Sequence, residues 1–225
     1  GSVEQVAYLF SGQGSQYPSM GAELYAQSPV FRKTFDEIAA YCAEYLPVSL
    51  SDVVFGPEAK SLLERTQFVQ PALFAVEYSL AMLWRDLGVV PRSVAGHSVG
   101  EVTAACFAGV FSLRDGVRLI CARGKAMSNA RTDGAMLAIA HDQGAVEQRI
   151  RTYDGQIQIA AINGPQNVVL SGDAEALCEL KTELDQADIR NRTLSVDRAF
   201  HSYHMDAVLD EFRDAISTVR FSAPE

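Results

Sequence analysis

The sequence predicts an α/β protein with parallel strand pairing, into which a smaller subdomain is inserted. In the first part of the chain, short apolar runs alternate with helical spacings of apolar residues, which is typical of strand–helix units around a parallel sheet. Residues 134–196 then give the order β-α-β-β-α-β, the ferredoxin-like arrangement. We therefore expect residues 1–131 to form the large subdomain, 132–197 the small one, and 198–225 a return to the large one.

The large subdomain is predicted to begin with a strand over Val6–Phe10, which ends at a glycine-rich loop around Gln13. A first long helix has apolar residues at helical spacing on one face, namely Phe31, Phe35, Ile38 and Cys42. A second helix is stopped by Gly88, and its apolar face consists of Leu73, Val76, Leu80 and Leu83.

A second strand is expected to end at Ala95, with a helix from Glu101 onward. Ser112, with Asp115 three residues later, resembles a capping box, although that box prefers Glu or Gln at the second position. This pair predicts another helix, which ends at about Met127. These elements precede the insertion.

Four strands and two helices are expected in the small subdomain. The strands are Gly134–Ala140, Ile157–Asn163, Asn167–Gly172 and Arg190–Val196. One helix covers Ala145–Tyr153, and the other has an apolar face of Ala174, Leu177, Leu180 and Leu184. In the returning segment, a last helix is predicted with one apolar face formed by Met205, Val208, Leu209, Phe212 and Ile216.

Composition limits the classes of function. With 225 residues, 48% of them hydrophobic, the chain can bury a sizeable core. The net charge of −9, without a basic stripe, argues against nucleic acid as a partner, and no apolar run reaches the roughly 18 residues of a membrane span. There is no signal-peptide pattern, and four separated cysteines lack C-x-x-C spacing. We therefore expect a cytoplasmic protein with reduced, buried thiols at Cys42, Cys106, Cys121 and Cys178.

The segment Gly96-His97-Ser98-Val99-Gly100 fits the pattern G-x-S-x-G between a predicted strand and a predicted helix. This is the context of a nucleophile elbow, a strained turn that exposes the serine hydroxyl and leaves no room for side chains beside it. Ser98 is therefore a candidate nucleophile. The backbone amide of Val99 and the Gln13 loop could stabilise an oxyanion, although G-x-S-x-G also occurs by chance and Gly-Gln-Gly is also an ordinary turn.

A serine nucleophile needs a base, and histidine is the usual one. His97 is a neighbour of Ser98 on a tight turn, where adjacent side chains point apart, so we interpret it as structural. His141 follows a strand in a polar turn and is expected to be solvated, and His204 is expected on the polar side of the last helix. His201 lies where the chain crosses between subdomains, where clefts form, which makes it the favoured base; a surface or capping role is equally compatible with the pattern.

Arg123 lies on one helical stripe with Gly116, Ile120 and Met127, so its charge is placed among small and apolar neighbours. A buried guanidinium is costly unless it is paired. It either reaches the surface or pairs with a structural carboxylate, or it binds the carboxylate of a ligand through two parallel hydrogen bonds.

Seven stretches in the same order along nearly the whole chain carry a resemblance to a known family: FSGQGSQYPSMG (10–21), TQFVQPAL (66–73), GHSVGE (96–101), RGKAM (123–127), GAMLAIA (134–140), AINGPQNVVLSG (161–172) and AFHSYHMD (199–206). Together they resemble the malonyl-CoA:acyl carrier protein transacylases, which include the acyltransferase domains of polyketide and fatty acid synthases. The resemblance implies an α/β, hydrolase-like parallel-sheet core with a ferredoxin-like insert.

The resemblance implies that Ser98 is the acylated nucleophile and His201 its base, and that Val99 and the Gln13 loop form the oxyanion hole. It implies that Arg123 binds the free carboxylate of a malonyl-type group. Substrate contacts are also expected from Met127, His97 and Phe200.

Phe200 precedes His201 in an Ala-Phe-His-Ser sequence. In the family that the chain resembles, this sequence is associated with malonyl units, whereas Tyr-Ala-Ser-His is associated with methylmalonyl units. The ring of Phe200 could fill the space that an α-methyl group needs. The alternative is that Phe200 packs only at the seam between subdomains.

The implied reaction is ping-pong acyl transfer from malonyl-CoA to the phosphopantetheine thiol of an acyl carrier protein. No metal or redox cofactor is expected, and we expect the chain to be part of a larger synthase, with a stand-alone malonyl transacylase of fatty acid synthesis as the alternative. Ser11 replaces the usual proline of the first motif, with little expected effect. Family members continue past the position of Glu225, so we expect the chain to be truncated there and the group that orients the histidine to lie beyond it.

Two other classes remain open. A serine esterase or thioesterase-like hydrolase shares G-x-S-x-G and needs a carboxylate between serine and histidine in the sequence, for which Asp173, Asp188 and Asp197 are candidates. A buried arginine would be unfavourable for an apolar acyl chain in such an enzyme. A docking domain without catalytic activity is the other alternative, and intact Ser98, His201 and Arg123 argue against it.

Overall fold

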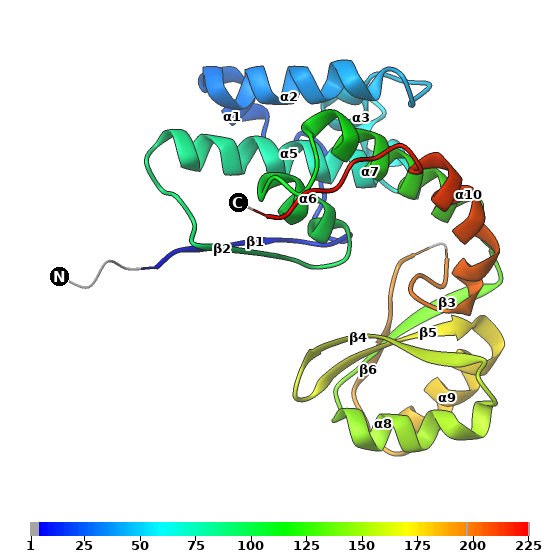
Figure 1. Ribbon diagram of the computed structural model, residues 1–225. Coiled ribbons are helices and arrows are strands. Elements are labelled where there is room, and N and C mark those ends of the chain that lie inside the picture. Colours follow the sequence, from blue (N-terminus) through cyan, green and yellow to red (C-terminus); the bar gives the residue numbers. More distant parts are fainter. Residues whose placement is uncertain (1–4, 197, 225) are drawn as a thin grey trace. The chain divides into compact units, whose positions relative to one another are not determined.

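The computed structural model describes residues 5–196 and 198–224, and the chain divides into two compact units (Figure 1). The large unit comprises Gly1–Ala126 and Phe212–Glu225, and the small unit comprises Met127–Glu211.

The unit boundaries differ from the predicted ones at both ends of the small subdomain: the small unit begins at Met127 instead of residue 132 and ends at Glu211 instead of residue 197. Residues 198–211 are predicted to return to the large subdomain, but they belong to the small unit. The reason is packing, because Phe200 joins an apolar cluster with Met136 and Val169 of the small sheet. In addition, the imidazole of His204 forms a hydrogen bond with Asp173.

The large unit combines two strands with a set of helices. The elements before the insertion are β1 (Ala7–Phe10), α1 (Ala22–Gln27), α2 (Pro29–Cys42), α3 (Leu50–Phe55), α4 (Ala59–Leu62), α5 (Thr66–Asp86), β2 (Ser93–Gly96), α6 (Val99–Phe107) and α7 (Leu113–Ser128). The predicted strands and long helices are confirmed. Helix α6 begins two residues before the predicted Glu101, because Ser98 itself occupies its N-cap position.

Strands β1 and β2 pair in parallel, with Ala7 opposite Ser93 and Phe10 opposite Gly96. Both strands therefore end at the same edge, where the backbone N–H of His97 donates a hydrogen bond of 2.9 Å to the carbonyl of Phe10. In open α/β sheets this carboxyl edge is where ligand sites form. The register thus brings the Gln13 loop and the Ser98 turn to one edge.

The helical core of the large unit lies between α2 and α5. The predicted apolar face of α2 is fully buried, and its members are Phe31, Phe35, Ile38 and Cys42. On α5, Leu73 is buried as predicted, but Leu80 is 36% exposed, so the predicted face is wrong at that position. The N-terminal turns of α5 face the core instead, through Phe68, Val69, Ala72 and their neighbours. None of the described helices is both long and apolar enough to cross a membrane.

The predicted cap of α7 is confirmed. Ser112 Oγ accepts a hydrogen bond of 3.1 Å from the backbone N–H of Asp115. The Asp115 carboxylate in turn accepts a hydrogen bond from the Ser112 hydroxyl at 2.9 Å, in place of the bond to the backbone that a Glu or Gln makes in a capping box.

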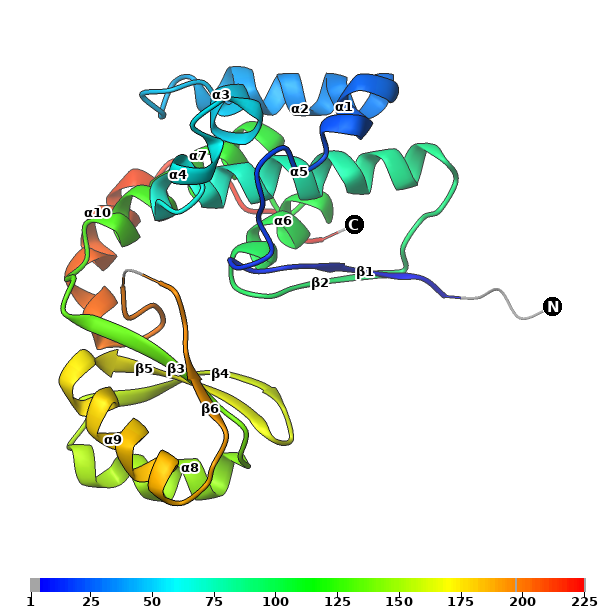
Figure 2. The same ribbon diagram turned by 180° about the vertical axis from the view of Figure 1, so that it is seen from behind.

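The small unit has the predicted ferredoxin-like topology, with sheet order β4-β5-β3-β6 and antiparallel pairing throughout. Its elements are β3 (Gly134–Ile139), α8 (Gln143–Ile150), the 3₁₀ turn η1 (Arg151–Tyr153), β4 (Ile157–Gly164), β5 (Asn167–Asp173), α9 (Ala174–Gln186), β6 (Asn191–Thr193), the 3₁₀ helix η2 (Tyr203–Val208) and the start of α10 (Leu209–Ala215). Helices α8 and α9 cover one face of the sheet in both views (Figures 1 and 2). That face is apolar, and its Leu137 and Leu170 pack in one cluster with Leu180 and Leu184 of α9.

Two elements differ from the predictions. The last strand is shorter than Arg190–Val196, because β6 pairs with β3 only opposite Leu137–Ile139. The single helix predicted after residue 198 is η2 followed by α10, and Leu209, expected on its buried face, is 47% exposed. A 3₁₀ segment turns by three residues rather than 3.6, so the apolar positions do not stay on one face.

The four thiols lie on helices, and all four are free. Cys42, Cys106 and Cys121 are buried as predicted, but Cys178 is exposed, so that prediction is wrong for Cys178. The buried stripe of α9 runs through Leu177, Leu180 and Leu184. Cys178, which follows Leu177, therefore lies on the solvent side of the helix.

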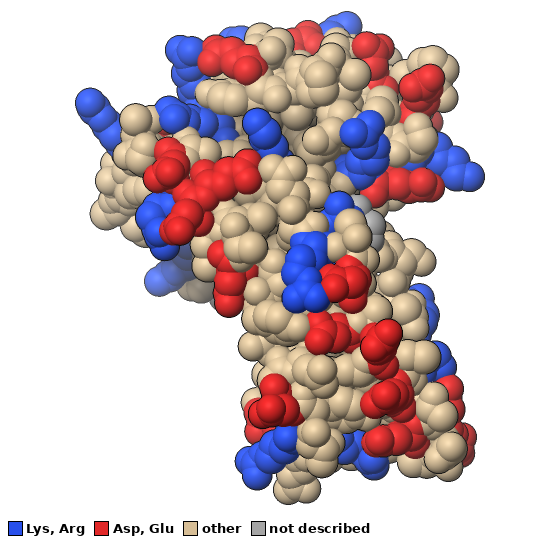
Figure 3. All heavy atoms as spheres, turned by 90° about the vertical axis from the view of Figure 1, so that its right-hand side faces the viewer, with Lys and Arg blue, Asp and Glu red and all other residues tan. Residues whose placement is uncertain are grey.

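Charged side chains of both signs are mixed on the face in Figure 3, and no basic stripe runs across it. This agrees with the charge balance of the sequence. Stripes of Lys and Arg are the usual sign of a nucleic-acid-binding surface.

Candidate active site

Ser98 lies at the N-terminus of α6 with a φ of 52°, a conformation that side chains rarely adopt. Glycines on both sides make this turn possible. A Cβ on Gly96 would lie 2.1 Å from the carbonyl carbon of Gly100, and one on Gly100 would lie 2.3 Å from the carbonyl oxygen of Phe10. The strand–turn–helix geometry predicted from G-x-S-x-G is therefore confirmed. The backbone N–H groups of Val99 and Gly100 lie in the first turn of α6, next to the serine.

The loop after β1 lies directly against this turn. A Cβ on Gly12 would be 2.7 Å from Nδ1 of His97 and 3.0 Å from the His97 carbonyl oxygen, so a larger residue would displace the His97 ring. Gln13 is half-buried in this loop, and His97 is exposed on the elbow. The predicted neighbours Gln13, His97, Ser98 and Val99 thus lie on two adjacent segments at the carboxyl edge of β1 and β2.

The guanidinium of Arg123, on α7, reaches the serine. Its Nη2 donates a hydrogen bond of 3.2 Å to Ser98 Oγ, and its Nη1 donates one of 2.7 Å to Oε1 of Gln70 on α5. Both acceptors are neutral. Burial lowers the pKa of Arg123, while the charge of Glu101 raises it. An arginine remains protonated in proteins, so α7 places a fixed positive charge next to the hydroxyl oxygen of Ser98.

Two polar residues of α5 were missed by the sequence reasoning. Gln70 is fully buried and holds Arg123, and Glu77, about two turns further along the same helix, contacts the loop after β1. Gln70 carries a signal that could have found it, because it is a polar residue within the apolar stretch FVQPALF. A buried amide among apolar residues needs a hydrogen-bond partner, and here the partner is the arginine.

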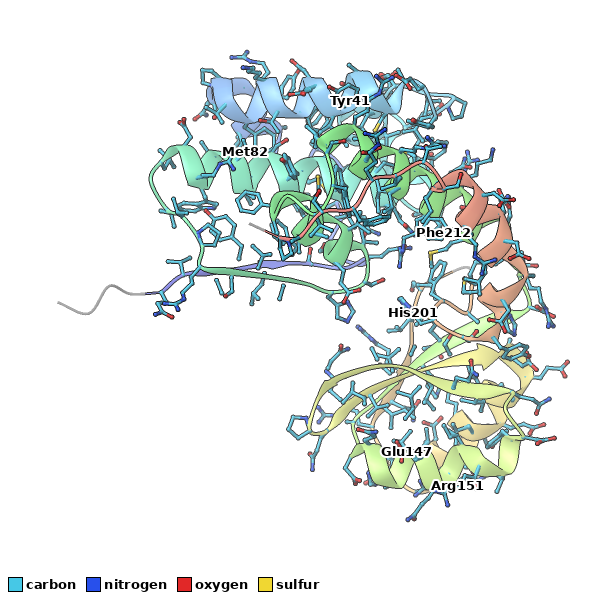
Figure 4. The ribbon with its side chains drawn as sticks, viewed as in Figure 1. Tyr41, Met82, Glu147, Arg151, His201 and Phe212 are labelled. Atoms are coloured by element: carbon cyan, nitrogen blue, oxygen red, sulfur yellow. The ribbon has the colours of Figure 1, made fainter. Side chains whose placement is uncertain are left out.

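His201 belongs to the small unit, on the loop before η2 (Figure 4). It is exposed and has a φ of 61°. Its turn is closed by Ser202, whose Oγ donates a hydrogen bond of 2.7 Å to the carbonyl of Ala199 and accepts one from the N–H of His204 at 3.3 Å. The loop therefore holds the backbone of His201 in a strained conformation while its side chain stays accessible.

His204 contradicts its prediction. It is expected on the polar side of a helix, yet it is only 1% exposed, and its Nε2 donates a hydrogen bond of 2.7 Å to Oδ1 of Asp173. The hydroxyl of Tyr203 donates to the same oxygen. The tighter 3₁₀ turn of η2 directs this side chain inward over Gly134, where a Cβ would lie 2.9 Å from its Nδ1.

The three carboxylates considered above for the catalytic triad of a hydrolase lie in different places. Asp173 is engaged by His204 and Tyr203 at the end of β5. Asp188 lies in the turn after α9 with a φ of 54°. Asp197 lies outside the described residues.

Phe200 and Met127 lie in one apolar cluster of the small unit. The Phe200 ring is 5% exposed and packs with Met136 and Val169, and Met127 packs against the same cluster. Their expected contacts with a substrate stay predictions. His141 is half-buried beside Asp142, with its Nδ1 2.9 Å from a carboxylate oxygen, at the surface turn where it is expected.

In the large unit, the structure thus brings Ser98, Val99, Gln13, His97 and Arg123 to one place, while His201, Phe200 and Met127 belong to the small unit. The first group joins a hydroxyl, a cation and the N-terminus of a nine-residue helix. Such a group can bind an anion and form a covalent bond through the serine oxygen. Among the residues that the structure describes, no group of three or more His, Cys, Asp or Glu could hold a metal ion.

Comparison with known proteins agrees with this geometry. Residues 7–225 match the family described as the acyl transferase domain. The chain belongs to this family. It is 43% identical over 227 residues to the polyketide synthase GfsB of Streptomyces halstedii, covering 100% of this chain and 4% of that protein. It is 41% identical over 225 residues to the hybrid synthetase acdB of Aspergillus candidus, covering 98% of this chain and 9% of that protein.

Solved acyl transferase domains share the fold. The acyltransferase domain from the second module of the salinomycin polyketide synthase matches with a TM-score of 0.92 and 43% identity. The match covers 98% of this chain and 51% of that one, so this acyl transferase chain spans about half the length of that domain. The acyl-carrier-protein-S-malonyltransferase of Bartonella henselae matches with a TM-score of 0.88 and 36% identity, over 98% of this chain and 72% of that one.

Proposed function

We propose that this acyl transferase domain moves a malonyl-type group from CoA to the phosphopantetheine thiol of an acyl carrier protein, within a polyketide synthase. The observation that carries the proposal is the hydrogen bond of 3.2 Å between the Arg123 guanidinium and Ser98 Oγ. A cation able to hold a carboxylate lies beside the atom that would be acylated. The similarity to polyketide synthases and to a malonyltransferase supports the choice of donor and acceptor.

In the first half-reaction, Ser98 Oγ attacks the thioester carbonyl carbon and its proton passes to His201. The tetrahedral intermediate collapses, the carbon–sulfur bond breaks, and the CoA sulfur leaves with the proton from His201. In the second half-reaction, the carrier thiol gives its proton to His201 and attacks the acyl-serine, and Ser98 Oγ leaves and recovers that proton. Every proton is thus returned, and the cycle needs no metal or redox cofactor.

The oxyanion of each tetrahedral intermediate would be stabilised by the amide of Val99 and by the Gln13 loop. Val99 opens α6, so its N–H has no partner within the helix and the helix dipole adds positive potential there. The amide after the nucleophile is the usual first donor of an oxyanion hole at a nucleophile elbow.

Arg123 would exchange partners when the substrate binds. The guanidinium that bonds to Ser98 and Gln70 offers parallel N–H groups to a malonyl carboxylate. The exchange frees the Ser98 hydroxyl for attack and fixes the direction of the thioester. Donor and acceptor are water-soluble molecules, and we place the reaction in the cytoplasm.

The test is intact-mass measurement of the acyl-enzyme after incubation with a panel of acyl-CoAs, followed by addition of an acyl carrier protein. A lasting malonyl adduct that moves to the carrier, and that Ser98→Ala abolishes, is the expected result. Rapid release of the acyl group to water would instead identify a serine hydrolase. Labelling that persists in Ser98→Ala would place the nucleophile elsewhere, and no adduct from any acyl-CoA would favour a docking domain.

A further inference from the structure

Glu77 on α5 holds the loop after β1 through one carboxylate oxygen. Its Oε1 accepts hydrogen bonds from the backbone N–H of Ser11, at 2.9 Å, and from the Ser11 hydroxyl, at 2.6 Å. Its Oε2 accepts a third hydrogen bond, of 3.2 Å, from the hydroxyl of Thr103 on α6. One side chain therefore connects the loop that carries Gln13 with the helix that begins at Ser98.

Ser11 is the point at which that loop leaves the sheet. The carbonyl of the preceding Phe10 accepts the N–H of His97, and the following Gly12 lies against the His97 ring. The elbow thus fixes one side of the loop, and Glu77 fixes the other. A proline at position 11 would have no N–H, so the double contact depends on the serine.

We propose that Glu77 is a positioning residue, which acts through Ser11 to hold the Gln13 loop where it stabilises the oxyanion formed at Ser98. This rests on the proposed acyl transfer, since that reaction forms the oxyanion. The hydrogen bonds of the carboxylate go to Ser11 and Thr103 and not to Ser98, so in this proposal it affects the rate only through the loop.

The position of Glu77 has an electrostatic cost. Burial raises its pKa, and the hydrogen bonds from Ser11 and Thr103 only partly oppose this. A folded-state pKa above the ordinary value means that the ionised form costs folding free energy, increasingly as pH rises past that value.

The test compares near-isosteric variants of the carboxylate. Glu77→Leu removes every acceptor, whereas Glu77→Gln keeps one carbonyl oxygen that can serve Ser11. We expect Glu77→Leu to lower kcat for acyl-serine formation about 10- to 100-fold, because a small displacement of an oxyanion donor costs this much. KM for malonyl-CoA should stay within about twofold, since the lost interaction exists only in the transition state. Glu77→Gln should recover most of the rate.

Two single hydroxyl deletions separate positioning from helix packing. Ser11→Ala and Thr103→Val each remove one donor to the same carboxylate, but only Ser11→Ala lies on the loop. Ser11→Ala should slow acylation severalfold, and Thr103→Val should keep nearly the wild-type rate. These variants also test the proposal if Glu77→Leu does not fold. Asp142→Ala, which removes the N-cap of α8 in the small unit, controls for a general loss of stability.

Each rate is also measured with a fluorophosphonate, in which Ser98 Oγ forms a bond to phosphorus and fluoride leaves. This probe needs the nucleophile and the oxyanion hole but no malonyl group. If the fluorophosphonate labels Ser98 while malonyl-CoA does not, the proposed substrate is wrong. The rates of fluorophosphonate labelling then still measure the role of Glu77. Wild-type labelling rates in Glu77→Leu, equal losses in Glu77→Leu and Glu77→Gln, or equal losses in Ser11→Ala and Thr103→Val would each overturn the positioning role.

Discussion

In the proposed reaction, Arg123 is the residue that would separate this site from that of an ordinary acyl hydrolase. Its guanidinium is held by Gln70 and by the serine oxygen, so a ligand carboxylate would find it already oriented. Replacing the Arg123 side chain by that of alanine would leave the ligand carboxylate unpaired in a partly dehydrated site. We expect Arg123→Ala to lower malonyl transfer by roughly 30-fold or more, and Arg123→Lys, which keeps the charge without the fork, to retain part of the activity.

The measurement is the ratio of acyl-enzyme formed from acetyl-CoA and from malonyl-CoA, in the wild type and in Arg123→Ala. The ratio should move toward acetyl, because the variant removes a charge that is unfavourable for an apolar group. Fluorophosphonate labelling of Ser98 serves as the control for folding. A ratio that does not move would make Arg123 a structural residue.

The strained backbone of His201 determines which substitution tests its role. With a φ of 61°, this position favours Asn over Ala, because Asn tolerates the left-handed region. We expect His201→Asn to fold normally and to slow acylation by roughly 10²–10⁴, the usual contribution of a positioned base. A near-normal rate, measured by the same intact-mass assay, would remove His201 from the mechanism.

Phe200 is predicted to select malonyl over methylmalonyl units. Its buried ring has little freedom to move, so an added α-methyl group would meet a packed surface. Overpacking costs ~1–3 kcal/mol, which corresponds to about 5- to 150-fold discrimination. Phe200→Ala should therefore shift the ratio of the two acyl-enzymes toward methylmalonyl. If a folded variant gives an unchanged ratio, the ring only packs the small unit.

The short helix η2 depends on one carboxylate. The carboxylate of Asp173, at the end of β5, accepts hydrogen bonds from the hydroxyl of Tyr203 and the imidazole of His204. These hydrogen bonds lower the pKa of Asp173. A folded-state pKa below the ordinary 3.8 stabilises the fold above that value, and the contribution is lost as the pH falls through the lower folded-state value.

We expect Asp173→Asn to reduce the free energy of unfolding at neutral pH, and the difference from the wild type to shrink under acidic conditions. Denaturant titrations over a series of pH values measure this difference. A difference that is constant with pH would show that the ionised carboxylate does not stabilise η2.

Apolar surface is concentrated on the large unit beside β1 and α5. Leu9 is 81% exposed, Leu87 64% and Trp84 47%, and a groove of about 370 Å³ runs between β1 and α5. Exposed apolar patches next to an open strand edge favour association. We expect the folded chain to bind a hydrophobic dye and to associate at high concentration.

Leu9→Lys should reduce both effects without lowering thermal stability, because the side chain is already exposed. Dye fluorescence and sedimentation, with thermal unfolding as the control, measure the change. Unchanged dye binding would place the apolar surface elsewhere.

Local patterns in the sequence were sufficient for much of this structure. The alternation of strands and helices, the buried stripe of α2 and the βαββαβ order follow from periodicity and turn residues, which act over a few positions. The turn at Ser98 follows in the same way, because its glycines are a local steric requirement.

Only the tertiary structure decided the features that depend on distant partners. The inward side chain of His204, the hold of Gln70 on Arg123, and the Glu77 carboxylate on Ser11 join residues 31, 53 and 66 positions apart. The sequence gives no spacing rule for such pairs, since their distance is set by how the elements pack. The same reason explains the unit boundary: residues 198–211 stay with the small sheet because Phe200 and His204 bury their side chains there, a preference that no local pattern contains.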